Sequence, residues 1–103
     1  MKPLIKPRDC DNIQEIRDSI DVIDRDILQL FAQRQEYVKE IVKFKSADEE
    51  GIIARERQEE VLKQRKAWAE ERDLDSEMME EVFRLLIDKN IQIQLDIYKT
   101  NNK

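Results

Sequence analysis

Residues 13–45 read IQEIRDSIDVIDRDILQLFAQRQEYVKEIVKFK, and this stretch decides the fold. Apolar side chains recur in it three and four positions apart, which is the period of one face of an α-helix. Every seventh position of that face holds an isoleucine with one exception, in the series Ile13, Ile20, Ile27, Arg34 and Ile41. Lys45 follows four residues after the last isoleucine, so a stripe expected to form a core contains two cations.

The same period continues along the chain and predicts three helices, at about 12–45, 53–72 and 76–99, and hence an all-α fold. Asp11 or Asn12 is expected to cap the first helix, and Asp75 or Ser76 the third, because their side-chain oxygens accept free amides of the first turn. Between the first two helices, residues 46–52 lose the stripe and include Gly51, the single glycine of the chain. We expect a loop there.

The length of the first helix predicts an oligomer. The chain has 103 residues, which predicts a single domain over 1–103. A helix of about 34 residues is roughly 50 Å long at ~1.5 Å per residue, whereas a compact monomer of this size is roughly 33 Å across. The apolar stripe runs along nearly the whole rod, so another chain must cover the overhang. We expect a homodimer in which the long helices pack together.

Composition excludes several classes of function. The net charge of −5 argues against a nucleic-acid partner, because neutralising phosphates requires a basic surface. The absence of histidine and the single cysteine, Cys10, make a metal or haem site improbable, so no cofactor is expected. The opening MKPLIKP has no apolar run and no segment is apolar enough to span a membrane. These features favour a soluble cytoplasmic protein.

Polar residues interrupt the predicted core stripes at four positions, Arg34, Lys45, Asn90 and Gln94, and Arg17 is a further cation beside the first stripe. Neither stripe supplies a carboxylate to pair with the cations, and burying several unpaired cations is costly. The missing anions are therefore expected to belong to a ligand. Arginine matches carboxylate geometry, so the pattern indicates a pocket for a small dicarboxylate, and it offers no nucleophile or proton shuttle.

Two alternatives remain open on the residues alone. Arginine and lysine can lie along apolar surface with their charged ends in water, and a buried Asn or Gln can fix the register of a bundle. A non-catalytic helical dimer, such as an adaptor, would then fit the sequence. A plain coiled-coil module is the second alternative, although it would leave the second and third helices without a function.

The chain also resembles a known family. The stretches that carry the resemblance are DC at 9–10, IRDSIDVIDRDI at 16–27, YVK at 37–39, FK at 44–45, ER at 56–57 and WAEERDLD at 68–75. In this order, and with Gln94 in the last helix, they resemble the all-helical chorismate mutase family. Within it they are most similar to the isochorismate-pyruvate lyases of salicylate and siderophore biosynthesis. The resemblance implies an intertwined homodimer with two identical pockets.

The resemblance also implies roles for individual residues. Arg34, together with Arg17 of the partner subunit, would bind the two substrate carboxylates. Lys45 and Gln94 would bond the ether oxygen between the ring and the enolpyruvyl side chain, with Asn90 one turn before Gln94. Both reactions of the family are cofactor-free pericyclic steps that need positioning and electrostatic stabilisation. The 46–52 loop would be a lid over the site, with Gly51 as its hinge.

Two positions point to different reactions within the family. Many of the mutases carry an acidic residue that binds the ring C4 hydroxyl, three positions before an arginine. Here those positions hold Ile52 and Arg55. Ile52 matches the apolar residue of the lyases, whereas Arg55 matches the additional carboxylate-binding arginine of the mutases. We therefore expect a lyase with secondary chorismate mutase activity, and a chorismate mutase of aromatic amino-acid biosynthesis is the alternative.

Overall fold

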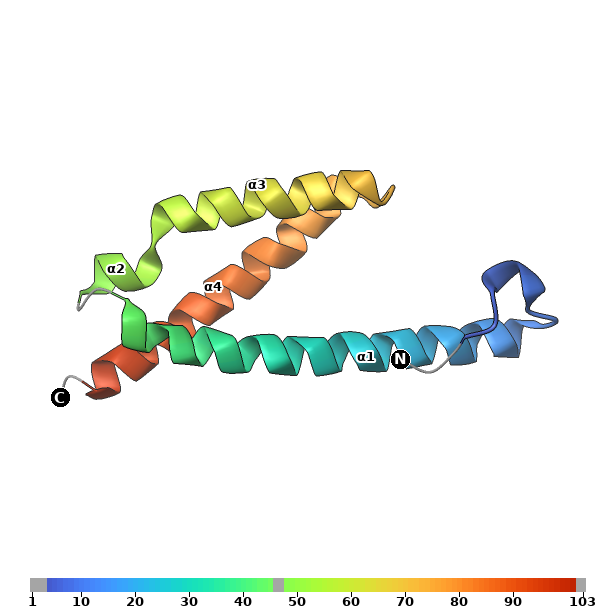
Figure 1. Ribbon diagram of the computed structural model, residues 1–103, viewed down its shortest axis with the longest axis horizontal. Helices are drawn as coiled ribbons and strands as arrows, with labels where there is room; N and C mark the ends of the chain where they lie inside the picture. The colour runs from blue at the N-terminus through green and yellow to red at the C-terminus, as the bar shows by residue number, and fades with distance from the viewer. Residues whose placement is uncertain (1–3, 46–47, 102–103) are drawn as a thin grey trace. The chain divides into compact units, whose positions relative to one another are not determined.

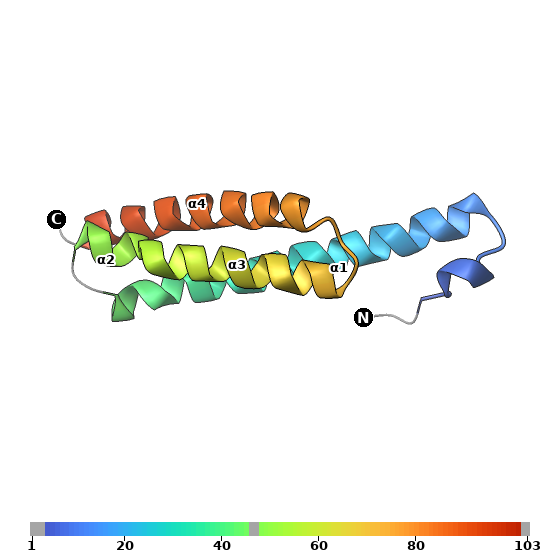
Figure 2. The ribbon, with the colours of Figure 1, turned by 90° about the horizontal axis from the view of Figure 1, so that it is seen from above.

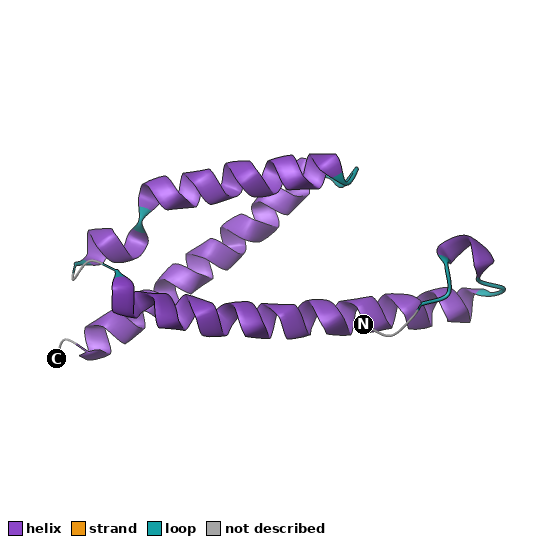
Figure 3. Ribbon diagram, viewed as in Figure 1, coloured by secondary structure: helices purple, strands orange, loops and turns teal. Residues whose placement is uncertain are grey.

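The computed structural model describes residues 4–45 and 48–101 of the chain, and within these ranges its regular elements are all helices joined by short loops, with no strand (Figure 3). Along the chain, the elements are the 3₁₀ turn Pro7–Asp9, α1 (Ile13–Glu40), the 3₁₀ turn Ile41–Phe44, α2 (Glu49–Ile53), α3 (Arg55–Glu71) and α4 (Ser76–Asn101). The all-α fold class predicted from the sequence is confirmed.

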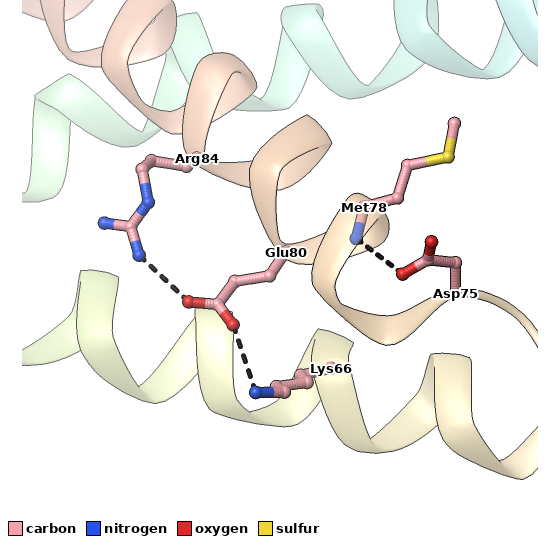
Figure 4. Close-up of polar contacts among 5 residues, drawn as sticks. All are labelled: Lys66, Asp75, Met78, Glu80 and Arg84. Atoms are coloured by element: carbon pink, nitrogen blue, oxygen red, sulfur yellow. Dashed lines mark hydrogen bonds and ion pairs between the residues drawn. The ribbon is translucent and has the colours of Figure 1, made fainter.

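The helix ends follow the capping rules. Asn12 Oδ1 accepts a hydrogen bond from the amide of Glu15 at 2.9 Å, and Asp75 Oδ1 accepts one from the amide of Met78 at 3.0 Å (Figure 4). Each bond satisfies an amide that has no partner inside its own helix. Of the two candidates offered at each end, Asn12 and Asp75 are thus the residues whose side chains cap α1 and α4.

The linker between the first two long helices differs from the prediction. Residues 46–52 were expected to form a loop, but Glu49–Ile53 form the short helix α2; Ser46 and Ala47 lie outside the described residues. Asp48 explains the difference, because its Oδ1 accepts from the amide of Gly51 at 2.7 Å and caps a helical turn that an isolated glycine did not suggest. Gly51 lies inside this turn without a positive φ, so its conformational freedom is not used here.

The first long helix is also shorter than predicted at its C-terminal end. The stripe predicted one helix to residue 45, whereas α1 ends at Glu40 and the next four residues tighten into a 3₁₀ turn. Lys45 then adopts an extended backbone, with φ −86° and ψ 157°. A 3₁₀ turn eclipses side chains three apart and rotates the following residues off the α-helical face. Lys45 is therefore placed by this turn and not by the heptad.

The chain divides into two compact units, with the boundary between Tyr37 and Val38. In the first unit, α1 has no buried residue, and its isoleucines form a solvent-exposed stripe along the helix. Ile13 and Ile20 are 62% and 50% exposed. Before α1, the Cys10 thiol donates to the carbonyl of Lys6 at 3.7 Å and folds the preceding segment into a turn. Whether the two units act as one domain stays a prediction.

The second unit has a core of its own, in which α3 and α4 lie side by side (Figures 1 and 2). The buried side chains are Val61 and Leu62 from α3 and Ile87 from α4, with Phe83 and Ile91 packed against them. Full burial of such a side chain contributes about 1.5–3 kcal/mol. This core fixes α4 relative to α3.

Charged side chains join the same two helices at the surface. The Glu80 carboxylate on α4 forms an ion pair with Lys66 of α3 at 3.6 Å and accepts a hydrogen bond from Arg84, one turn further along α4, at 3.0 Å (Figure 4). Exposed pairs of this kind contribute about 0–1 kcal/mol each. The apolar core, and not these pairs, therefore dominates the packing of α3 on α4. None of the helices in the described ranges combines the length and apolarity needed to cross a membrane.

Candidate active site

A polar network in the second unit surrounds the ammonium group of Lys45. Lys45 Nζ donates to the main-chain carbonyl of Ile52 at 2.6 Å and to Oε1 of Gln94 at 2.7 Å. The other end of the Gln94 amide, Nε2, donates to the main-chain carbonyl of Val38 at 2.9 Å. The network connects the end of α1, the residue after the 3₁₀ turn, α2 and α4. It brings together Lys45, Gln94 and Ile52, three of the residues selected from the sequence.

The two sides of the network come from different local features. Gln94 faces the interior because α4 keeps its apolar period through Ile87 and Ile91, and at 5% exposure it is a buried polar side chain. Ile52 is 1% exposed, which makes it the most buried residue among those described. Its side chain packs into the unit while its carbonyl reaches the ammonium. Both acceptors of Lys45 are thereby fixed by burial.

The hydrogen-bonding capacity of each group fixes the orientation of the amide. An ammonium group can only donate, so the oxygen of Gln94 must face Lys45 and its nitrogen must face the carbonyl of Val38. Each nitrogen then keeps one donor that the network does not use, because the ammonium has three hydrogens and the amide nitrogen has two. One N–H bond on each nitrogen is thus not used within the network.

Electrostatics distinguish two of the cations from ordinary surface residues. Burial lowers the pKa of the Lys45 ammonium, and it also lowers the pKa of the Arg34 guanidinium. In the part of the chain that the structure describes, no carboxylate lies within ion-pair distance of either group. An anionic ligand would offset the cost of this desolvation.

The other residues selected from the sequence are divided between the two units. Arg17 and Arg34 belong to the first unit, the former exposed and the latter half-buried. Arg55 is exposed at the start of α3 and lines a surface hollow with three glutamates. Asn90 is half-buried on α4, one turn before Gln94. Their roles stay predictions, and so does the role of 46–52 as a lid.

Sequence reasoning missed three groups of the network. Two are the main-chain carbonyls of Val38 and Ile52, which carry no residue-specific signal. The third is Asp48, whose capping bond organises α2. Here a signal existed, because an aspartate before a short run of helix-compatible residues is an N-cap signature, but the neighbouring glycine was interpreted as a helix breaker.

Comparison with known proteins identifies the family. The model of the family described as chorismate mutase type II matches residues 16–95. The chain belongs to this family. It is 40% identical over 93 residues to the isochorismate pyruvate lyase of Pseudomonas aeruginosa, covering 90% of this chain and 91% of that protein. It is also 35% identical over 72 residues to the T-protein of Haemophilus influenzae, covering 70% of this chain but 19% of that protein.

Membership of the type II chorismate mutase family confirms the resemblance read from the sequence. It places the chain among pericyclic enzymes that act on chorismate-type substrates, so the adaptor and coiled-coil alternatives are set aside. The match to residues 16–95 includes Arg17, Arg34, Lys45 and Gln94.

Proposed function

We propose that the protein is an isochorismate-pyruvate lyase, which converts isochorismate to salicylate and pyruvate, with weaker chorismate mutase activity. The observation that carries this proposal is the likeness to a lyase of the same length over nine-tenths of the chain. Ile52 supports it, because an apolar, fully buried side chain cannot accept a hydrogen bond from a ring hydroxyl. A cytoplasmic location and the lack of a cofactor, nucleic-acid partner or membrane partner stay predictions.

The substrate carboxylates are bound by arginines in this proposal. Arg34 takes one carboxylate and Arg17 of the partner subunit takes the other, since a guanidinium offers paired donors that match a carboxylate. Two observations support the assignment. Burial lowers the pKa of Arg34 while the described residues provide it with no carboxylate partner, and Arg17 is exposed on a helix that needs a covering surface.

The ether oxygen of the substrate takes the donors left over in the Lys45 network. As the bond between this oxygen and the ring breaks, a ring hydrogen moves to the methylene carbon of the enolpyruvyl group, and the products are salicylate and pyruvate. Negative charge grows on the oxygen during the step, and the ammonium of Lys45 stabilises it. No proton passes through the protein in this step, and apart from Lys45 the network consists of an amide and two main-chain carbonyls, which are not general bases.

The proposed homodimer follows from the surface of α1. The isoleucines of the stripe are exposed in the single chain, although a run of apolar side chains at helical spacing normally faces a partner surface. A second copy with two-fold symmetry covers both stripes at once, and it also brings Arg17 of the partner subunit to each site.

Chorismate mutase is the second candidate function. The match to the family model favours it, together with Arg55, which the resemblance relates to the carboxylate-binding arginine of the mutases. The structure gives Arg55 an exposed position among glutamates, an unfavourable setting for a dicarboxylate in the single chain.

Parallel assays with isochorismate and chorismate separate the two candidates. Salicylate is followed by its fluorescence, and chorismate consumption by loss of absorbance. The lyase proposal predicts a kcat/KM for isochorismate at least about tenfold above that for chorismate, a difference of ~1.4 kcal/mol in transition-state stabilisation. Efficient formation of prephenate without salicylate would establish the mutase instead.

A further inference from the structure

We propose that α2 is a positioning element for Lys45, with the main chain of Ile52 as its contact and Asp48 as the residue that holds the element in place. The ammonium is bonded by the Ile52 carbonyl on one side and by Gln94 on the other, which directs its third hydrogen at the substrate. This inference rests on the proposed function and adds to it residues that do not touch the substrate.

The first step of the argument is the end of α2. A helix leaves its last carbonyls without partners inside the helix. The backbone of Ala54 enters the left-handed region, with φ 49° and ψ 59°, so α2 does not run on into α3. Side chains then satisfy the freed carbonyls. Gln58 Nε2 donates to that of Ile53 at 2.8 Å, and Lys45 Nζ donates to that of Ile52 at 2.6 Å.

The second step is the rigidity of this acceptor. The Ile52 side chain is 1% exposed, so its peptide group cannot shift without exposing an isoleucine to water. At the other end of the helix, Asp48 accepts from the amide of Gly51 at 2.7 Å, and its own carbonyl accepts from the amide of Ile52 at 3.2 Å. Asp48 thus bonds directly to the residue that bonds Lys45.

The third step is the opposite acceptor. Gln94 is 5% exposed, and its amide is held by the carbonyl of Val38, so its oxygen also has a fixed position. A flexible lysine bonded to two fixed acceptors loses most of its rotamer freedom before the substrate arrives. Donors fixed in advance are those that stabilise developing charge without reorganisation.

Asp48→Ala is the decisive variant, with Asp48→Ser as its matched control. Both remove the carboxylate charge, but serine caps a helix about as well as aspartate, whereas alanine does not. Asp48 is exposed and lies outside the proposed binding groups, so neither change should unfold the protein. With isochorismate, we expect kcat of the alanine variant to fall about fivefold, the change that losing an N-cap produces in the population of a marginal helix. KM should change less than kcat, and the serine variant should match the wild type.

A second readout does not depend on catalysis. The ammonium protons of Lys45 exchange slowly with water only while both acceptors hold them, so their ¹⁵N-correlated NMR signal should be visible in the wild type and the serine variant. It should be lost in the alanine variant at an unchanged melting temperature. A merely structural role of Asp48 would instead lower the melting temperature and leave kcat and the signal unaltered.

The outcomes separate the inference from the proposed function. Equal kcat values and equal Lys45 signals in the alanine and serine variants would overturn the positioning role while leaving the lyase intact. If the wild type converts neither substrate, the proposed function fails, and the NMR comparison still decides whether α2 holds Lys45.

Discussion

The two compact units of the chain differ in how far the apolar side chains of their helices are buried. In the first, residues 4–37, the isoleucines of α1 are 41–62% exposed at Ile13, Ile16, Ile20 and Ile27. In the second, from Val38 on, the core residues Val61, Leu62 and Ile87 are 8–9% exposed. Both units show the same helical period, so the sequence pattern alone does not say which stripe is buried by its own chain.

This difference indicates a division of tasks. The second unit has a buried core of its own and holds Lys45 in a network of hydrogen bonds, although some of its apolar side chains, such as Phe44 and Leu85, are exposed. The first unit contains Arg17 and Arg34 and exposes the isoleucines of α1. We propose that a second copy of the chain covers this apolar face. Packing within one chain would then fix the position of Lys45, whereas binding of the substrate carboxylates would require the dimer.

The largest effect on activity is expected when Lys45 of the second unit is replaced. Lys45→Ala should lower kcat for the proposed reaction by about 10²–10³-fold, the usual effect of removing one preorganised donor to a developing negative charge. Lys45 lies outside the apolar core, so the fold should be kept, but the melting temperature should fall modestly because the buried Gln94 oxygen loses its donor. Steady-state kinetics and thermal denaturation check both parts. A fall of less than about threefold in kcat would remove Lys45 from the chemistry.

Mixing two inactive variants tests the first unit. Arg17→Ala and Arg34→Ala should each be nearly inactive alone, because each removes one carboxylate contact from every site. If Arg17 acts on the partner's site, a mixed dimer has one intact site and one that lacks both arginines. An equal mixture, exchanged to equilibrium, should then recover about a quarter of the wild-type activity. No recovery, with dimer exchange verified by mass spectrometry, would place both arginines in the site of one subunit.

A pair of truncations compares the packing of the two units directly. Leu62→Ala should destabilise the protein by about 2–5 kcal/mol, as expected for a large-to-small change in a core. Ile20→Ala would cost less than about 0.5 kcal/mol if its helix face stayed in water. If a second copy covers that face, Ile20→Ala should instead lower stability and make the melting temperature depend more steeply on protein concentration. If the melting temperature of the wild type does not depend on protein concentration, the proposal that a second copy covers this face of α1 is wrong.

The sequence predicted much of this fold because its signals are local. Heptad spacing gave the long helices, and single residues such as Asn12 and Asp75 gave their starts. The same spacing selected Lys45 and Gln94 as polar groups on core faces. Helical spacing could not predict their hydrogen bond, because it joins positions 49 residues apart, and the bond from Gln94 to Val38 joins positions 56 apart; only the family resemblance placed Lys45 and Gln94 at one site. Trp68 shows that residue type alone does not predict burial, because this large aromatic side chain is 47% exposed and lies under the Arg65 guanidinium.

The pH dependence of activity should show that Lys45 is held by a desolvated network. In the proposed reaction, catalysis needs the protonated ammonium of Lys45, which is present below its pKa, and burial lowers that pKa. The rate should therefore decline on the alkaline side at a lower pH than the titration of an exposed lysine would allow. In Lys45→Arg, whose guanidinium stays charged, the residual activity should lack this decline. An unchanged alkaline limb in that variant would assign the titration to another group.

The smallest effect is expected where the second unit turns from α3 to α4. The amide of Leu74 donates to the carbonyl of Ala69 and that of Asp73 donates to Glu70, the hydrogen-bond pair of a Schellman motif. Asp73 carries the positive φ of 55° that this motif requires, a conformation that glycine adopts without a steric cost. Asp73→Gly should thus change stability by no more than about +1 kcal/mol, because relief in the folded state is partly offset by the greater freedom of the unfolded chain. Asp73→Ala keeps the Cβ and should not stabilise the folded state.

Chemical denaturation of the two variants measures the difference in the free energy of unfolding. Since the turn lies outside the Lys45 network, kcat should stay constant. A change in kcat would mean that the α3–α4 turn and Lys45 are coupled through the core of the second unit.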